Sequence, residues 1–465
     1  MSKTGYTGLV NRTCRFISGI ASGYVAIICN IAYTAASIPL ALQYLTKEEF
    51  GLWALAQQIS GYLLMLDLGV SFSLNRLIAD QKERVDSPAY QDWLKNGALT
   101  FACLGTLMLA LGCCFSFLAP TIFSISNSLA PDFTNVLLIL TVVNSISFST
   151  RIFAVPLWAF QRMDVSNYLA ALSLFSNFGT LWLCFKMGWG VYSFALAGVF
   201  PCLVIPFLTY LFCKKNHYYP SLFFGGSFRF KYLKRLFSFS KDVSELSIGF
   251  QVLQASQIII LSRVCGLETA ALFAVGTKLY TLVSQLIYKI IESSAPGLTE
   301  IYLSGNIPLF RSRLHQLISL TLFAGFMGAL CFFTFNHYFV SIWTKRVFSW
   351  PQINDIFLAL TIVLNSFSRW LVGFFGILGD YRSVRHLYLV EAVAYLCAAG
   401  LLAQFFEIQG VLFAALFCHA IITIPFSFSS FKRETGLSCV RRPFAVVTIL
   451  LCLFMFIQTT EYFTF

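Results

Sequence analysis

The sequence has 465 residues, of which 58% are hydrophobic and only 11% are charged, and phenylalanine alone contributes 50 of them. No soluble globular protein has this composition, so we expect an integral membrane protein in which lipid surrounds most side chains. The formal net charge is +12, but the basic residues are dispersed among hydrophobic runs, which excludes a continuous basic face for nucleic acid.

The predicted elements are helices that cross a membrane. A spanning helix needs roughly 20 mostly apolar residues to cross a hydrocarbon core of about 30 Å. Twelve runs meet this requirement: 19–45, 50–79, 96–118, 133–157, 166–187, 190–213, 243–264, 268–295, 314–342, 353–379, 386–405 and 409–430. The first run is too long for the apolar region of a signal peptide, about 7 to 15 residues, so we expect it to stay uncleaved. A thirteenth segment, 444–458, is of marginal length and either spans the membrane or lies at its surface.

The distribution of Lys and Arg between the loops indicates the orientation. Segment 214–241 contains seven basic residues, whereas the loops on the opposite side contain only Lys47, Lys186, Arg263, Lys345 and Arg346. Cytoplasmic loops are enriched in Lys and Arg, so we predict a cytoplasmic N-terminus. Residues 228–237 are basic and amphipathic, which suits contact with anionic membrane lipids, although an ordinary cytoplasmic loop explains their charge almost as well.

The two halves of the chain share residues at an offset of 220. The matched positions are Glu48, Leu52, Ala54, Arg162, Tyr168 and Leu169 with Glu268, Leu272, Ala274, Arg382, Tyr388 and Leu389. Several matches at one offset indicate a duplicated six-helix unit, and six spans return the chain to its starting side. We therefore predict an all-α polytopic membrane protein of two pseudo-symmetric six-helix bundles with a substrate site between them. The predicted parts are bundle 1–213, a basic cytoplasmic linker 214–242, bundle 243–430, and a basic loop with a hydrophobic segment, 431–465.

Ionisable residues inside spans are costly and usually face a cavity or a partner. Lys278, Gln285, Lys289 and Glu292 are spaced by seven, four and three residues, which places them on one stripe of a helix. Lys278 falls near the bilayer centre, so we expect it to face a cavity, the alternative being an ion pair with an acidic residue of a neighbouring helix. Lys289 lies near the inner face, where snorkelling also explains it.

Two arginines occupy similar places in the two halves. Arg369 has Asn365 one turn earlier, and Arg151 shares a face with Ser147 and Asn144. Arg369 lies deep enough for a cavity role, whereas Arg151 lies nearer the cytoplasmic end and is expected to snorkel. The predicted substrate-binding residues are therefore Lys278, Arg369, Lys289, Arg151, Gln285 and Asn365. Because they are mainly basic, they suit an anionic phosphate or pyrophosphate group.

Carboxylates inside spans have two interpretations. Asp67, Glu292 and Glu391 either couple transport to protons or sodium, or form structural ion pairs. No catalytic apparatus is visible: a Walker loop is missing, no extramembrane segment exceeds about 30 residues, and the five histidines have no ligand spacing. We therefore expect neither an enzyme nor a metal or other cofactor.

The second predicted helix carries a recognisable motif. It consists of Glu49-Phe50-Gly51-Leu52-Trp53-Ala54-Leu55, then Leu66-Asp67-Leu68-Gly69, then Asn75-Arg76. This motif resembles the polysaccharide and O-antigen flippases of the multidrug, oligosaccharidyl-lipid and polysaccharide exporter superfamily, and the two-by-six helix plan extends the likeness. The resemblance implies alternating access around a central cavity and an undecaprenyl-pyrophosphate-linked oligosaccharide as substrate, moved across a bacterial cytoplasmic membrane. A thirteenth helix would depart from the family's even number.

Two other functions fit the same setting. A multidrug exporter of the same superfamily moves organic cations and uses buried carboxylates, which the excess of Lys and Arg disfavours. A membrane-embedded sugar polymerase or ligase is expected to have a large external loop with catalytic Arg and His. The longest external loops expected here, 119–132 and 343–352, are short.

Overall fold

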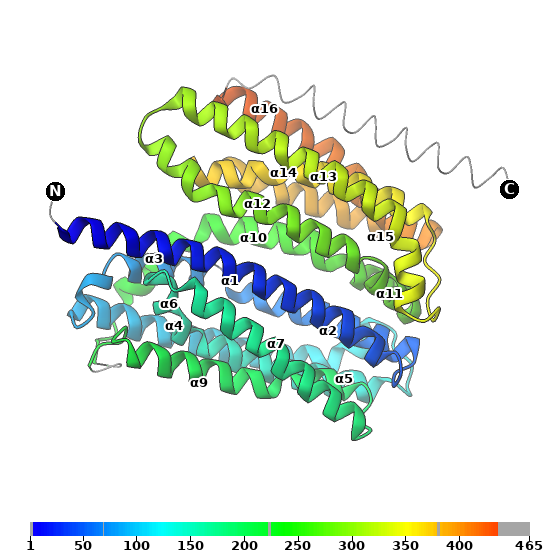
Figure 1. Cartoon of the computed structure of the whole chain (residues 1–465). Helices are drawn as coiled ribbons and strands as arrows, with labels where there is room; N and C mark the ends of the chain where they lie inside the picture. The colour runs from blue at the N-terminus through cyan, green and yellow to red at the C-terminus, as the bar shows by residue number, and fades with distance from the viewer. Residues whose placement is uncertain (1–2, 68, 222–224, 379–381, 436–465) are drawn as a thin grey trace. The chain divides into compact units, whose positions relative to one another are not determined.

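The computed structural model describes residues 3–67, 69–221, 225–378 and 382–435. All regular secondary structure in these ranges is helical, which confirms the predicted all-α class. Nine helical stretches in the described residues are long and apolar enough to cross a membrane, and a bent helix pair adds a tenth. The chain divides into two compact units, Met1–Ser247 and Ile248–Phe465 (Figure 1).

The first unit contains the blue to green helices of Figure 1. They are α1 (Lys3–Ala41), α2 (Lys47–Leu63), α3 (Val70–Ala79), α4 (Pro88–Ile122), α5 (Ala130–Ser149), α6 (Val155–Ala159), α7 (Met163–Lys186), α8 (Tyr192–Ala197), α9 (Val199–Lys215) and the start of α10 (Phe230–Val264). Helix α1 packs along α7, and α4 packs along α5. A Cβ atom at Gly105 or Gly112 of α4 would collide with Ser149 or Thr141 of α5. Small residues thus allow the close approach that is typical of packed membrane helices.

The predicted span 50–79 is broken at its centre. Helix α2 begins with a capping box between Thr46 and Glu49, continues into a 3₁₀ turn, Leu64–Asp67, and meets α3 at an angle of 43°. Gly69 has a φ of 71°, which an L side chain rarely adopts, and the Asp67 carboxylate accepts hydrogen bonds from the Ser71 amide and hydroxyl. The carboxylate therefore caps the start of α3 at the bend.

The segment between α9 and α10 is docked on the start of α4. The Asp86 carboxylate accepts hydrogen bonds from the amide and hydroxyl of Ser221, and Asp92 holds Ser227 in the same way. Helix α10 begins at Phe230, so the last part of the predicted linker 214–242 is helical and runs directly into the predicted span 243–264. The sequence has no Pro or Gly between 228 and 248 to end that helix.

The second unit contains the rest of α10 and the green to orange helices of Figure 1. They are α11 (Leu267–Gly276), α12 (Lys278–Leu303), α13 (Ile307–Trp343), α14 (Ile353–Leu378), α15 (Arg382–Cys418), a π-helix (His419–Thr423) and α16 (Ile424–Thr435). Helices α12, α13 and α14 pack against one another. The predicted segment 444–458 lies outside the described residues.

Helix α15 reverses direction at Glu407, whose φ of 46° and ψ of −123° are not helical. A Cβ atom at Gly410 would collide with the backbone of Leu402, eight residues earlier, so the two arms lie against each other at the turn. The predicted spans 386–405 and 409–430 are therefore two antiparallel helices. Every one of the twelve predicted runs forms helix in the described residues.

Candidate functional site

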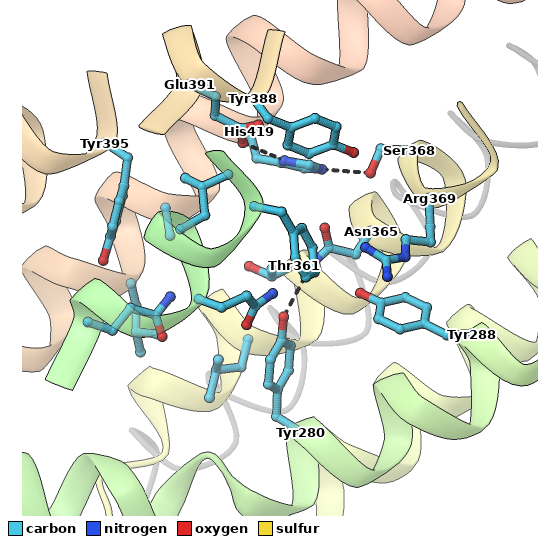
Figure 2. A pocket seen from close by; sticks show the side chains of 17 residues that line it. Tyr280, Tyr288, Thr361, Asn365, Ser368, Arg369, Tyr388, Glu391, Tyr395 and His419 are labelled. Carbon is cyan, nitrogen blue, oxygen red and sulfur yellow. Dashed lines mark hydrogen bonds and ion pairs between the residues drawn. The ribbon is translucent and has the colours of Figure 1, made fainter. Parts of the chain in front are cut away.

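A small pocket lies inside the second unit, between α10, α12, α14 and α15 (Figure 2). Its volume is ≈ 70 Å³. A water molecule needs roughly 10 to 15 Å³ measured in this way, so the pocket holds a few waters and not a saccharide. Four tyrosines line it, Tyr280, Tyr288, Tyr388 and Tyr395, together with the predicted site residues Arg369, Asn365 and Glu391.

Arg369 is held in the pocket by aromatic rings. Its guanidinium carbon lies 4.5 Å from the ring centre of Phe250 and 4.8 Å from that of Tyr288, and Figure 2 shows the Tyr288 side chain beside the guanidinium group. One turn earlier, the Asn365 amide donates a 3.1 Å hydrogen bond to the Tyr280 hydroxyl. No carboxylate forms a salt bridge with Arg369 in the described residues. The rings therefore position the cation while leaving its hydrogen-bond donors available to an anion.

Glu391 is buried in a second part of the pocket wall. One of its oxygens lies 2.6 Å from Nδ1 of His419, and the other accepts a 2.5 Å hydrogen bond from the Thr423 hydroxyl. On the far side of the imidazole, Nε2 lies 2.9 Å from the Ser368 hydroxyl (Figure 2). All four side chains are buried, with relative exposures between 0% and 7%.

The sequence predicted Glu391 but not His419 and Thr423, which bind it, or Ser368, which binds His419. His419 stands in an apolar run with Thr423 four residues later as its polar neighbour, and Ser368 precedes Arg369 like any serine in a membrane helix. The π-helix that presents His419 and Thr423 has no sequence signature, and only the reversal of α15 brings it beside Glu391. The signal available was a histidine in an apolar run, with a threonine four residues later and an intramembrane glutamate twenty-eight residues earlier.

The predicted stripe on α12 lies on a different face of that helix from Tyr280 and Tyr288. Neither Lys278 nor Lys289 lines the pocket, and Gln285 and Glu292 are exposed. Lys289 is paired with Glu292 at 3.2 Å, within the same helix. The structure thus brings Arg369, Asn365 and Glu391 together without the α12 stripe, whose expected role in binding substrate stays a prediction.

The first unit contains a second polar pocket, with a volume of ≈ 350 Å³, which is lined by Arg151 together with Ser147, Thr150 and Asn177. Arg151 stacks over Phe148 at 4.5 Å, as Arg369 stacks over Phe250. Unlike Arg369, it also lies 3.4 Å from a carboxylate oxygen of Asp67. The predicted snorkelling arginine and the predicted intramembrane carboxylate therefore form one ion pair.

Metal-ligating side chains do not gather anywhere in the described ranges. The cysteines described there are free thiols, many of them on apolar helix surfaces. The chemistry available at the pocket is therefore that of Arg369, the tyrosine hydroxyls and the Glu391–His419 pair.

Solved structures with the same architecture show the fold of the chain. An inward-facing multidrug resistance transporter of the MATE family, within the MOP superfamily, matches with a TM-score of 0.73 at 14% identity, over 88% of this chain and 95% of that chain. A MOP superfamily transporter from Pyrococcus furiosus, described as having a binding pocket of reverse polarity that suggests a different function, matches with a TM-score of 0.66 at 13% identity, over 90% and 95%. The chain has the MATE-like fold of two six-helix halves, as predicted.

The family follows from a sequence model. The model of the family described as "Polysaccharide biosynthesis protein" matches residues 21–302, and the chain belongs to that family. No curated protein matches the chain. Family and fold together confirm the resemblance seen in the motif around Asp67, and the apolar helices make this a multi-pass membrane protein.

Proposed function

We propose that the protein is a flippase that moves an undecaprenyl-pyrophosphate-linked oligosaccharide, such as an O-antigen or other polysaccharide repeat unit, across the bacterial cytoplasmic membrane by alternating access. The observation that carries the proposal is Arg369, a cation that stacks on two aromatic rings at a pocket and that no carboxylate among the described residues neutralises. Membership of a polysaccharide biosynthesis family supports a saccharide as cargo.

The chemistry of Arg369 suits a phosphate group. Its planar guanidinium offers a fork of N–H donors that matches phosphate oxygens, and burial strengthens such charge-assisted hydrogen bonds. The pocket is too small for a saccharide, so Arg369 would hold the anionic headgroup while the sugar and the lipid lie elsewhere. Tyr280, Tyr288 and Tyr388 add hydroxyl groups that can donate to the same oxygens.

A multidrug exporter for organic cations is disfavoured by the state of the carboxylates. Asp67 is paired with Arg151 and bonded to Ser71, while Glu391 is bonded to His419 and Thr423. Neither is available to a cationic drug without breaking an existing network. An anionic substrate therefore agrees better with Arg369, which forms no salt bridge in the described residues.

The connectivity of Ser368, His419 and Glu391 is that of a nucleophile, a base and an orienting acid, and it raises the question of hydrolysis. Ser368 lies in the middle of α14, where backbone N–H groups are used by the helix itself. No pair of amides is left there to stabilise an oxyanion. This arrangement favours a proton-handling or structural network over acyl transfer.

Reconstitution in lipid vesicles tests the proposal. The probe is a fluorescent polyprenyl-pyrophosphate-linked N-acetylglucosamine, and the measurement is its exposure to a quencher added outside. Arg369→Ala should slow translocation by about 10-fold or more, because hydrogen bonds to a charged group are lost, and Arg369→Lys should recover it only in part. Arg313→Ala removes a cation from an exposed position of the same unit and serves as the matched control. Unchanged translocation by Arg369→Ala would contradict the proposed site.

A further inference from the structure

The buried carboxylate of Glu391 is held by two residues of a single π-helix. His419, at the start of the π-helix, and Thr423, at its end, each contact one oxygen, at 2.6 Å and 2.5 Å. π-Helical turns are rare and occur frequently at functional sites. An ionised carboxylate at this depth requires partners of this kind, since an unpaired buried charge is costly.

The hydrogen bonds define where a proton would go. With Glu391 ionised, the ring nitrogen that faces it, Nδ1, must carry a hydrogen, because a carboxylate only accepts. A neutral ring then leaves Nε2 as the acceptor of the Ser368 hydroxyl hydrogen. Addition of one proton at Nε2 reverses that bond, so Nε2 donates and the Ser368 hydroxyl must turn its hydrogen toward another acceptor.

The pocket gives water a path to the Glu391–His419 pair, and it also contains Ser368, whose hydrogen bond depends on the protonation of His419. Ser368, Glu391 and His419 all line it, and its volume of ≈ 70 Å³ accommodates a few waters that can deliver a proton. Ser368 is the residue before Arg369, so a change in its hydrogen bond occurs beside the proposed anion site. Ser366, two residues earlier, instead donates to the backbone of its own helix at 2.6 Å and takes no part in the network.

We propose that Glu391 and His419 form a proton-binding site in the second unit, which takes up one proton from water in the Arg369 pocket and signals its charge to that pocket through Ser368. The titratable groups that face the pair are Tyr388 and Tyr395 on α15, Tyr280 and Tyr288 on α12, Arg369 on α14, and Cys418 beside His419. The part of α10 that lines the pocket contributes the uncharged residues Phe250, Leu253, Gln254 and Gln257. Of these neighbours only Arg369 is ordinarily charged near neutral pH, whereas an imidazole ordinarily changes charge between pH 5 and 8.

The site is tested first without transport, by ¹⁵N NMR of the histidine-labelled full chain in lipid nanodiscs. The chain has five histidines, so the His419 signals are assigned by their loss in His419→Gln. The expected result is a ring with one N–H at pH 8 that becomes doubly protonated as the pH falls to 5. A ring that stays in one protonation state over that range would overturn the proposal. The titration itself is measured on the unmodified chain, and the variant serves only to assign the signals.

The second test asks whether the proton matters for transport, and this arm rests on the proposed flippase function. Translocation of the fluorescent lipid probe is measured with and without a pH gradient across the vesicle. His419→Gln and Ser368→Ala should lose the effect of the gradient while still exchanging the probe downhill, and Ser366→Ala should behave like the unmodified protein. Retention of the full gradient effect by His419→Gln would overturn the coupling role. If the unmodified protein does not move the probe, the flippase proposal fails, whereas the NMR titration still decides the proton site.

Discussion

Arg151 and Arg369 each stack on an aromatic ring within their own unit, but in the part of the chain that the structure describes only Arg151 has a carboxylate partner. Arg151 stacks on Phe148 and lies 3.4 Å from Asp67, whereas Arg369 stacks on Phe250 and Tyr288. Because the Asp67 carboxylate neutralises Arg151, the anion site that we propose is at Arg369 and not at Arg151.

The Asp67–Arg151 pair is expected to stabilise the bend of the first unit. Asp67→Ala removes the ion pair and the cap of α3 together, so we expect a loss of about 1 to 3 kcal/mol in stability, discounted for the partial exposure of both side chains. Thermal unfolding in detergent, followed by the fluorescence of a thiol-independent dye, measures the loss. Ser71→Ala removes only the hydroxyl bond and should cost less; an equal cost in both variants would show that the ion pair contributes little.

The hydrogen bonds between the Asp86 carboxylate and Ser221 should make the docking of the segment after α9 depend on pH. Hydrogen bonds from the Ser221 amide and hydroxyl lower the pKa of the Asp86 carboxyl below its usual value. A group with a lowered folded-state pKa stabilises above its ordinary pKa of about 3.9 and loses that contribution as the pH falls through the lowered value. Hydrogen exchange at the Ser221 amide, corrected for intrinsic rates, should therefore be slow at pH 6 to 8 and accelerate only as the pH falls below the ordinary Asp pKa of about 3.9. Asp86→Asn should exchange fast at all these pH values, whereas Asp80→Asn, on the exposed end of α3, should not.

The reversal of α15 should depend on two backbone positions. Glu407 adopts a φ of 46°, which glycine tolerates better, so Glu407→Gly should be neutral or stabilising by up to about 1 kcal/mol. Gly410→Ala should destabilise the second unit, because the added methyl meets the Leu402 backbone. Gly400→Ala serves as the control, since nothing lies within 4 Å of a Cβ built there. Thermal unfolding of the three variants gives the comparison, and a loss in Gly400→Ala equal to that in Gly410→Ala would refute the steric explanation.

The sequence predicted the helices, and it also singled out Arg369, Asn365 and Glu391, which line the pocket. Apolar runs, and the polar or charged residues inside them, are visible one residue at a time. The sequence was insufficient for partnerships that depend on tertiary structure. The pairing of Asp67 with Arg151, 84 positions later, required the bend after α2 and the 3₁₀ turn that carries Arg151. The same holds for His419, which reaches Glu391 only because α15 reverses.

Helix periodicity correctly predicted that the polar stripe of α12 lies on one face of the helix. That face is not the one that lines the pocket. Lys278, Lys289 and Glu292 do share one side of α12, but the pocket meets the side that carries Tyr280 and Tyr288. Aromatic residues in an apolar helix look like lipid-facing or core residues in the sequence. The stacking of Arg369 on Phe250 and Tyr288 became visible only from the packing of α10, α12 and α14.

The last prediction concerns orientation. The connection after α9 contains Ser221 and directly follows Lys214 and Lys215 in the last turn of that helix. It is docked on the start of α4 through Asp86 and Asp92, so it lies on the same side of the membrane as that end of α4. The loop before α4 also carries Lys82 and Arg84, and the positive-inside rule places such basic loops in the cytoplasm. A cysteine at Ser221, in a chain whose native cysteines are replaced, should therefore resist a membrane-impermeant maleimide in intact cells and react after permeabilisation. A cysteine at Ser126, in the connection after α4, should react without permeabilisation. Labelling of the Ser221 position from outside would reverse the proposed orientation for both halves at once.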